Sequence, residues 1–147
     1  MRIVVTGAQG QLGTDLQQVL QGQHLTLLDL PAFDLTHQDC GRRIIDAAPD
    51  VVIHAGAHTD VDGAERDPAL AMAINADGTE RIARAAAQAG ARLIYISTDY
   101  VFDGRGTRPY VETDQTNPVS AYGASKCAGE ERALADCDNT LVVRTAA

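Results

Sequence analysis

The sequence predicts an α/β fold in which a parallel sheet is doubly wound, with helices packed on both of its faces. Short apolar runs rich in β-branched residues alternate with longer helical stretches along the whole chain, which is the pattern of such a sheet. A glycine-rich turn directly follows the first apolar run. The sequence has no internal repeats or low-complexity segments, so its 147 residues are expected to form one domain.

Five strands and four helices are expected, with boundaries set by turn and capping residues. The strands cover residues 3–5, 25–29, 50–57, 92–97 and 141–144. The helices cover residues 11–21, 37–48, 68–89 and 118–135, the third with a bend near Gly78. Thr36 is the expected cap of the second helix, and Asn117 with Pro118 is the expected start of the last. Residues 103–117 form a long loop that is a candidate lid.

Composition and charge exclude several classes of function. A formal net charge of -8 and a pI near 4.7, without a basic stripe, argue against a nucleic-acid partner. The three cysteines form no CxxC pair, and no His, Cys or carboxylate spacing is typical of a metal site. No apolar run approaches the ~20 residues that cross a bilayer, and Gly7 comes too early for a signal peptide. We therefore expect a cytoplasmic protein with reduced thiols and no membrane partner.

The turn after the first strand predicts dinucleotide binding. Gly7, Gly10 and Gly13 have the spacing GxxGxxG, and the predicted helix begins within this motif, at Gln11. Such a turn brings backbone N–H groups and a helix N-terminus to a pyrophosphate, and small residues permit the close approach. The motif is weak in isolation, but its place between a strand and a helix favours a Rossmann-type nucleotide site.

Asp29 ends the second predicted strand, 19 residues after Gly10. This is close to the distance expected for an acid that bonds the adenosine ribose hydroxyls. A carboxylate at this position favours NADH over NADPH because it repels a 2′-phosphate. The alternative is an ordinary exposed aspartate at a strand end.

Tyr122 and Lys126 lie four residues apart in the last predicted helix and therefore share one of its faces. A nearby cation favours the phenolate and so lowers the pKa of a tyrosine, which suits a phenol for proton transfer to or from a ketone oxygen. Thr98 lies at the carboxyl end of the fourth strand, where a hydroxyl fits a role beside the reacting atom. The alternative is an ordinary amphipathic helix and a strand that ends in an ordinary threonine.

The histidines near the third strand are not expected to act as acid or base. His54 lies within the strand and is interpreted as a core residue. His58 follows the strand and is interpreted as a packing or hydrogen-bonding group near the cofactor. Asn75, inside the third helix, is expected to bond toward a neighbouring strand or to face polar surroundings.

These motifs together resemble the N-terminal half of the extended short-chain dehydrogenase/reductase superfamily. GxxGxxG and the spacing YxxxK occur throughout that superfamily. More specific runs, in the same order, are similar to the dTDP-4-dehydrorhamnose reductase family, and the matching stretches are distributed over nearly the full length of the chain. They are residues 7–13, 57–62, 97–104 and 122–130.

The resemblance implies a catalytic or binding role for several matched positions. Tyr122 is implied as the proton donor, and Lys126 as its pKa partner and a ligand of the cofactor ribose. Thr98 would contact the substrate and tune Tyr122, with Asp99 beside it at the sugar. Asp15 falls where some relatives carry an acid that helps to bind Mg²⁺ at a dimer interface.

The implied cofactor is NADH or NADPH. Gly10, Gln11 and Leu12 would hold its pyrophosphate, within the turn that Gly7 and Gly13 delimit. The remaining implied cofactor contacts are Asp29, Asp34 and Leu35 at the adenosine, and Ala57, His58 and Thr59 nearer the nicotinamide.

The implied activity is reduction of the C4 ketone of dTDP-4-dehydro-L-rhamnose to dTDP-L-rhamnose, a step of nucleotide-sugar biosynthesis. The implied partners are a nucleotide-sugar substrate and a possible homodimer. The part that binds the sugar would follow Ala147, so residues 1–147 are expected to be a truncated dinucleotide-binding domain. Two alternatives stay open: another nucleotide-sugar epimerase or dehydratase of the same superfamily, and a non-catalytic regulatory subunit of methionine adenosyltransferase.

Overall fold

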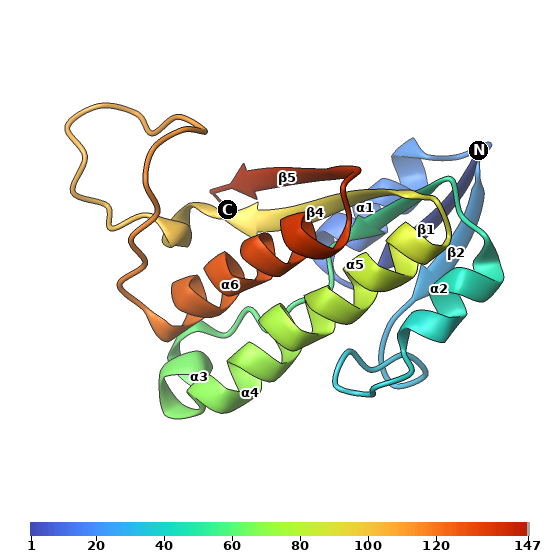
Figure 1. Cartoon of the computed structure of the whole chain (residues 1–147), viewed down its shortest axis with the longest axis horizontal. Coiled ribbons are helices and arrows are strands. Elements are labelled where there is room, and N and C mark those ends of the chain that lie inside the picture. Colours follow the sequence, from blue (N-terminus) through green and yellow to red (C-terminus); the bar gives the residue numbers. More distant parts are fainter. Residues whose placement is uncertain (147) are drawn as a thin grey trace.

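Five parallel strands form a single sheet in the computed structural model, which describes residues 1–146 (Figure 1). Their order across the sheet is β2-β1-β3-β4-β5. The chain leaves β1 toward one edge and returns past it to β3, so the order reverses between β1 and β3. In open α/β sheets a ligand binds at the carboxyl ends of the strands beside such a reversal. The strands are β1 (Arg2–Thr6), β2 (His24–Leu28), β3 (Val51–His54), β4 (Arg92–Thr98) and β5 (Thr140–Thr145).

Helices cover both faces of the sheet, which confirms the predicted doubly wound architecture. Helix α1 (Gln11–Val19) lies behind the sheet in Figure 1, while α2 (Gly41–Ala47), α5 (Thr79–Gln88) and α6 (Ala121–Asp136) lie in front of it. Helix α1 begins at the predicted residue and ends two residues before the predicted Gln21.

The sequence alternation along β1 divides the core between the two faces. Val4 packs with the α2, α5 and α6 layer, in a cluster that includes Ile82 and Leu93. Ile3 and Val5 point to the opposite face and pack with α1. Burying each such side chain contributes about 1.5–3 kcal/mol, so the alternation fixes which face each helix covers.

The predicted bent helix over residues 68–89 is divided into three segments. Helix α4 (Pro68–Met72) continues into a π-helical turn (Ala73–Gly78) and then into α5. Gly78 lies at the end of the π turn, where a Cβ atom would come within 2.9 Å of the Leu35 Cβ. A short helix, α3 (Val61–Arg66), was not predicted, since six residues with a central glycine give little periodic signal.

The prediction that Thr36 caps a helix beginning at His37 is wrong. Both the backbone N–H and the hydroxyl of Thr36 donate to Asp34 Oδ1, at 2.8 and 2.7 Å. The threonine therefore closes a local turn around Asp34, and residues 37–40 form bends and turns instead of a first helical turn. Helix α2 begins only at Gly41.

The predicted start of the last helix at Asn117 and Pro118 is also wrong. Ser120 is the N-cap of α6, and its hydroxyl accepts the backbone N–H of Gly123 at 3.0 Å. The Asn117 amide instead donates to Asp103 at 3.2 Å, which ties the preceding loop to itself. Tyr122 and Lys126 consequently lie in the first two turns of α6.

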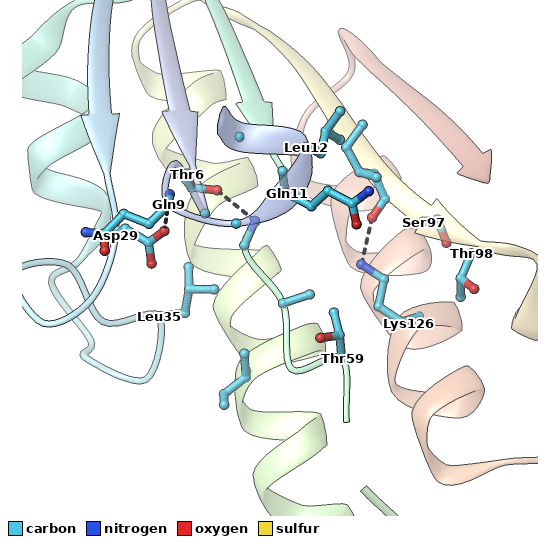
Figure 2. Close-up of a pocket in the computed structure, with 18 of the residues that line it drawn as sticks. Thr6, Gln9, Gln11, Leu12, Asp29, Leu35, Thr59, Ser97, Thr98 and Lys126 are labelled. Atoms are coloured by element: carbon cyan, nitrogen blue, oxygen red, sulfur yellow. Dashed lines mark hydrogen bonds between the residues drawn. The ribbon is translucent and has the colours of Figure 1, made fainter. Parts of the chain in front are cut away.

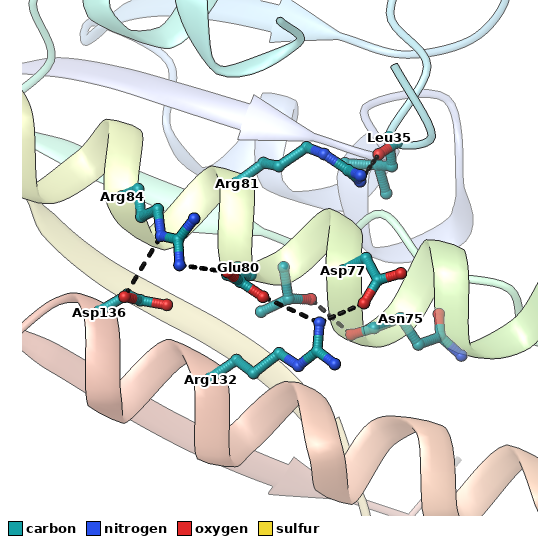
Figure 3. A network of polar contacts seen from close by, with 9 residues as sticks. Leu35, Asn75, Asp77, Glu80, Arg81, Arg84, Arg132 and Asp136 are labelled. Atoms are coloured by element: carbon teal, nitrogen blue, oxygen red, sulfur yellow. Dashed lines mark hydrogen bonds and ion pairs between the residues drawn. The ribbon is translucent and has the colours of Figure 1, made fainter. Parts of the chain in front are cut away.

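An ionic network joins α5 to α6 on the outer side of the helix layer (Figure 3). Arg132 lies between Asp77 and Glu80, and Arg84 bridges Glu80 and Asp136. These groups are partly exposed, so each pair contributes little to stability, about 0–1 kcal/mol. They connect α5 and the preceding π turn to α6 along the edges of these helices.

No helix within residues 1–146 combines the length and the apolar character needed to cross a membrane.

Candidate active site

A cavity of about 850 Å³ opens along the carboxyl ends of the strands (Figure 2). Almost every site residue predicted from the sequence lines it, whether from the glycine turn, the strand ends or α6. His58 is the exception. The predicted residues that line the cavity are Gly7, Gly10, Gln11, Leu12, Gly13, Asp29, Asp34, Leu35, Ala57, Thr59, Thr98, Asp99, Tyr122 and Lys126.

The glycine turn is packed so tightly that side chains cannot replace its outer glycines. Gly7 has φ +68°, and a Cβ there would lie 2.6 Å from the backbone nitrogen of Gly56. A Cβ at Gly13 would lie 2.2 Å from the Gly7 carbonyl oxygen. Gly10 is the N-cap of α1 and gives it no side-chain hydrogen bond, so the first N–H groups of the helix are free of a capping side chain. Such N–H groups bind a phosphate oxygen well.

Asp29 holds the glycine turn from the neighbouring strand end. Its Oδ2 accepts the backbone N–H of Gln9 at 2.7 Å, and its Oδ1 accepts that of Leu30 at 2.8 Å (Figure 2). Asp34 lines the same end of the cavity, and the hydrogen bonds from Thr36 lower the pKa of its carboxyl. Two carboxylates therefore lie where the resemblance places the adenosine.

Lys126 is almost completely buried at the other end of the cavity, with 3% of its surface exposed. Its ammonium donates to the carbonyl oxygen of Ile96 at 2.7 Å and lies 4.3 Å from the centre of the Tyr95 ring. Burial lowers the pKa of Lys126 to about 7, because desolvation disfavours the charged form.

Tyr122 lies one helical turn before Lys126 and is half-buried, with its ring edge-on to that of Tyr100 at 5.5 Å between centres. The expected lowering of its pKa by Lys126 is wrong for this structure. Burial raises the pKa of Tyr122, against a smaller lowering from the Thr98 hydroxyl. The Lys126 ammonium does not lower it, because that group is directed at Ile96 on β4.

Thr98 and Asp99 line the same end of the cavity as Tyr122 and Lys126. The Thr98 hydroxyl donates to Asp99 Oδ1 at 3.3 Å and accepts the backbone N–H of Tyr100 at 3.2 Å. These bonds orient the Thr98 oxygen beside Tyr122 at the carboxyl end of β4, where a substrate oxygen can approach.

Asn75 organises the loop after β3 although its place in the π turn gave no strong signal. Its Oδ1 accepts the His58 N–H at 2.8 Å, and its Nδ2 donates to the His58 carbonyl at 3.0 Å and to Ser125 Oγ at 2.9 Å. Ser125 in turn donates to the Tyr122 carbonyl at 2.7 Å. The chain beside the cavity and the helix that carries Tyr122 are therefore joined through one buried amide.

The predicted roles of the two histidines have different outcomes. His54 is buried between Thr6 and Thr79, and burial lowers its pKa to about 3, so it is a neutral core residue as predicted. His58 has its backbone tied to Asn75, but its Nδ1 is buried without a partner among residues 1–146. A hydrogen-bonding role for its side chain stays a prediction.

Several cavity residues were not predicted as site residues. Thr6 accepts the Gly56 N–H at 3.3 Å, which fixes the strand ends around the glycine turn. Ser97 precedes Thr98 at the end of β4. Their common signal is a hydroxyl at the carboxyl end of a strand. Asp15 also lines the cavity, but residues 1–146 contain no group of three potential metal-ligating side chains.

Comparison with known proteins identifies the family. The family model described as "RmlD substrate binding domain" matches residues 1–147, the whole chain. This chain belongs to that family. A dTDP-4-dehydrorhamnose reductase of Mycobacterium tuberculosis H37Rv is 48% identical to it, and the match covers 99% of this chain and 49% of the relative. The corresponding protein of Escherichia coli K12 is 41% identical over 99% of this chain and 50% of its own length.

Solved structures of the RmlD family have the same fold. A dTDP-4-dehydrorhamnose reductase of Clostridium acetobutylicum superposes with a TM-score of 0.95 at 42% identity, over 99% of this chain and 53% of its own. The Bacillus anthracis enzyme, solved in complex with NADP, superposes with a TM-score of 0.93 at 38% identity, over 97% and 52%. This chain therefore spans about half the length of the relatives that it matches.

Proposed function

We propose that the chain binds NADPH or NADH in the cavity and supplies the proton-transfer groups for reduction of the C4 ketone of dTDP-4-dehydro-L-rhamnose. The observation that carries this proposal is the convergence of Thr98, Tyr122 and Lys126 at one end of a cavity whose other end is a glycine turn. The names of the relatives support the substrate, and the NADP complex of the Bacillus anthracis enzyme supports the cofactor.

The chain's own residues fit a dinucleotide. Side chains at Gly7 and Gly13 would collide with neighbouring backbone atoms, so these glycines allow the close packing of the turn, and the uncapped first turn of α1 offers N–H donors to a pyrophosphate. The carboxylate of Asp29 lies where ribose hydroxyls would donate to it. At the opposite end, Lys126 is the candidate donor to the second ribose. When bound, the dinucleotide supplies the hydride that reduces the ketone carbon.

Tyr122 is the candidate acid for the ketone oxygen. Its raised pKa keeps the phenol protonated at neutral pH, which is the state that donates a proton. Thr98 orients the accepting oxygen, and its hydroxyl offsets part of the effect of burial on the pKa of Tyr122. Asp99, bonded to Thr98, is placed to contact a sugar hydroxyl.

Three further features remain predictions from the sequence. They are Mg²⁺ bound by Asp15 at a dimer interface, the homodimer itself and a cytoplasmic location.

Two measurements test the proposal. The chain is titrated with NADPH and with NADH, and we expect saturable binding that raises nicotinamide fluorescence. The chain is then fused to the remaining half of a matched relative, and ketosugar-dependent oxidation of NADPH is followed. Tyr122→Phe should lower turnover by about 100-fold or more, because it removes only the acid, while the cofactor affinity stays within roughly twofold.

Undiminished turnover by the Tyr122→Phe fusion would contradict the assignment of the acid. Conversion of a nucleotide-sugar without net loss of NADPH would instead support an epimerase. Cofactor binding with no turnover in the fusion, joined to co-purification with methionine adenosyltransferase, would support the regulatory subunit.

A further inference from the structure

A buried carboxylate lies directly behind the reactive end of the cavity. Glu130 is 4% exposed and stands one helical turn after Lys126 on α6, so the two side chains share a helix face. Its Oε1 accepts the Ser97 hydroxyl at 2.5 Å and Arg144 Nε at 2.9 Å, and its Oε2 accepts the second guanidinium nitrogen at 2.7 Å. One carboxylate thus joins α6, β4 and β5.

This arrangement is costly to bury. Removing a carboxylate from water costs several kcal/mol, and its partner Arg144 keeps 25% of its side chain exposed. A buried pair often stabilises a fold no more than apolar residues of the same volume. Most other ion pairs in residues 1–146, such as Arg2–Asp50 and Arg42–Asp46, are largely exposed and carry no such cost. A role beyond folding therefore explains Glu130 better than stability alone.

The surroundings of Lys126 indicate that role. Its burial favours the neutral amine, and the groups that face it from β3, β4 and α6 differ in their effect on its charge. His54 is neutral, and Tyr95 offers its ring face while its hydroxyl donates to the Lys126 carbonyl at 3.4 Å. Tyr122 is protonated, whereas the Glu130 carboxylate opposes the effect of burial on the Lys126 pKa.

We propose that Glu130, fixed by Ser97 and Arg144, is a positioning residue that favours the charged form of Lys126 beside the reactive end of the cavity. Ser97 lines the cavity and donates to Glu130, so the Glu130 carboxylate is held directly behind the cavity wall. The inference rests on the proposed function, because a charged Lys126 matters there for binding the ribose of the cofactor.

The chain itself offers a direct measurement, because Lys126 is its single lysine. Protein grown with isotopically labelled lysine gives one Cε resonance, whose chemical shift follows the charge of this amine. The titration is recorded for the wild type and for Glu130→Gln, which keeps the shape and removes the charge. Glu131→Gln is the matched control, since that neighbouring carboxylate lies on the exposed side of α6.

We expect the Lys126 titration midpoint to fall by about one pH unit or more in Glu130→Gln and to stay unchanged in Glu131→Gln. The direction in which the Lys126 midpoint changes distinguishes an effect of the Glu130 charge from a purely structural role of Glu130. If Glu130 served only to hold the fold, its loss would loosen the packing, hydrate the amine and raise the midpoint toward the ordinary value of about 10.4. A raised or unchanged midpoint would therefore overturn the proposal.

Arg144→Gln gives a second measurement, should Gln at position 130 prevent folding. Removing this guanidinium leaves the carboxylate unneutralised, so the Lys126 midpoint should rise while the amides of α6 keep their protection from hydrogen exchange. An unchanged midpoint, or a rise that accompanies loss of this protection, would overturn the proposal. Binding of NADPH to the same samples tests the proposed function separately. Wild-type chain that fails to bind NADPH would defeat that function, whereas the shift of the lysine midpoint decides the role of Glu130.

Discussion

The side chain of Lys126 reaches from α6 to β4 and donates its ammonium to the carbonyl oxygen of Ile96 at 2.7 Å. A single hydrogen bond does not compensate a buried charge, and the pKa of Lys126 falls to about 7 as a result. The free chain therefore holds a group that is unfavourable for folding and favourable for binding an anionic, hydroxyl-rich ligand.

Replacing Lys126 with methionine should stabilise the chain. The folded state binds the lysine proton more weakly than the unfolded state, so wild-type stability falls as the pH decreases from about 10.5 to about 7. Lys126→Met removes this cost, and we expect a gain of roughly 3–4 kcal/mol in the free energy of unfolding at pH 7, measured with urea.

The pH dependence supplies the control for this prediction. Above a pH of about 10.5 the amine is neutral in both states, so the difference between the two proteins should shrink to their packing difference. A constant difference across this range would show that the charge of Lys126 does not cause it.

Gly13→Ala should destabilise the chain and abolish dinucleotide binding. The new Cβ would meet the Gly7 carbonyl at 2.2 Å, so the glycine turn and α1 must move apart. We expect a loss of at least roughly 2 kcal/mol in the free energy of unfolding. Gly10→Ala is the comparison, because its Cβ would come no closer than 3.3 Å and should cost less than about 1 kcal/mol. An equal loss of unfolding free energy in the two variants would contradict the close contact between Gly13 and the Gly7 carbonyl.

Asn75→Ala should cost roughly 2–4 kcal/mol, because it leaves the His58 backbone groups and Ser125 without their buried partner. Asn139→Ala removes an exposed amide that accepts only from Arg92, and we expect a change within about 0.5 kcal/mol. Urea unfolding of both variants measures the difference. A small effect at Asn75 would mean that water replaces the amide.

The strands and most of the cavity could be predicted because their signals are local. Val4, Val52 and Leu93 lie in short apolar runs, and parallel strands bring the residues that follow such runs to one edge. Asp29 and Thr98 line the cavity for that reason, and no contact needs to be known to expect it.

The features that the sequence did not reveal depend on competition between partners. Thr36 and Asn117 both have the chemistry of a helix cap, but each side chain donates to a nearby aspartate and is thereby oriented within a local turn or loop. The pKa of Tyr122 was predicted in the wrong direction because helical spacing fixes where a lysine begins and not where its ammonium ends. A long, flexible side chain is decided by the tertiary structure.

The strand order also sets the distance between the two ends of the cavity. Asp29 follows β2 and Lys126 bonds to β4, with β1 and β3 between them, so three strand spacings, or about 14 Å, separate the two ends. A mononucleotide covers one end only, and two short ligands can occupy both ends without displacing each other. Under the proposed function, a ligand that contacts both ends must be extended, so the strand order sets a requirement on the length of the ligand.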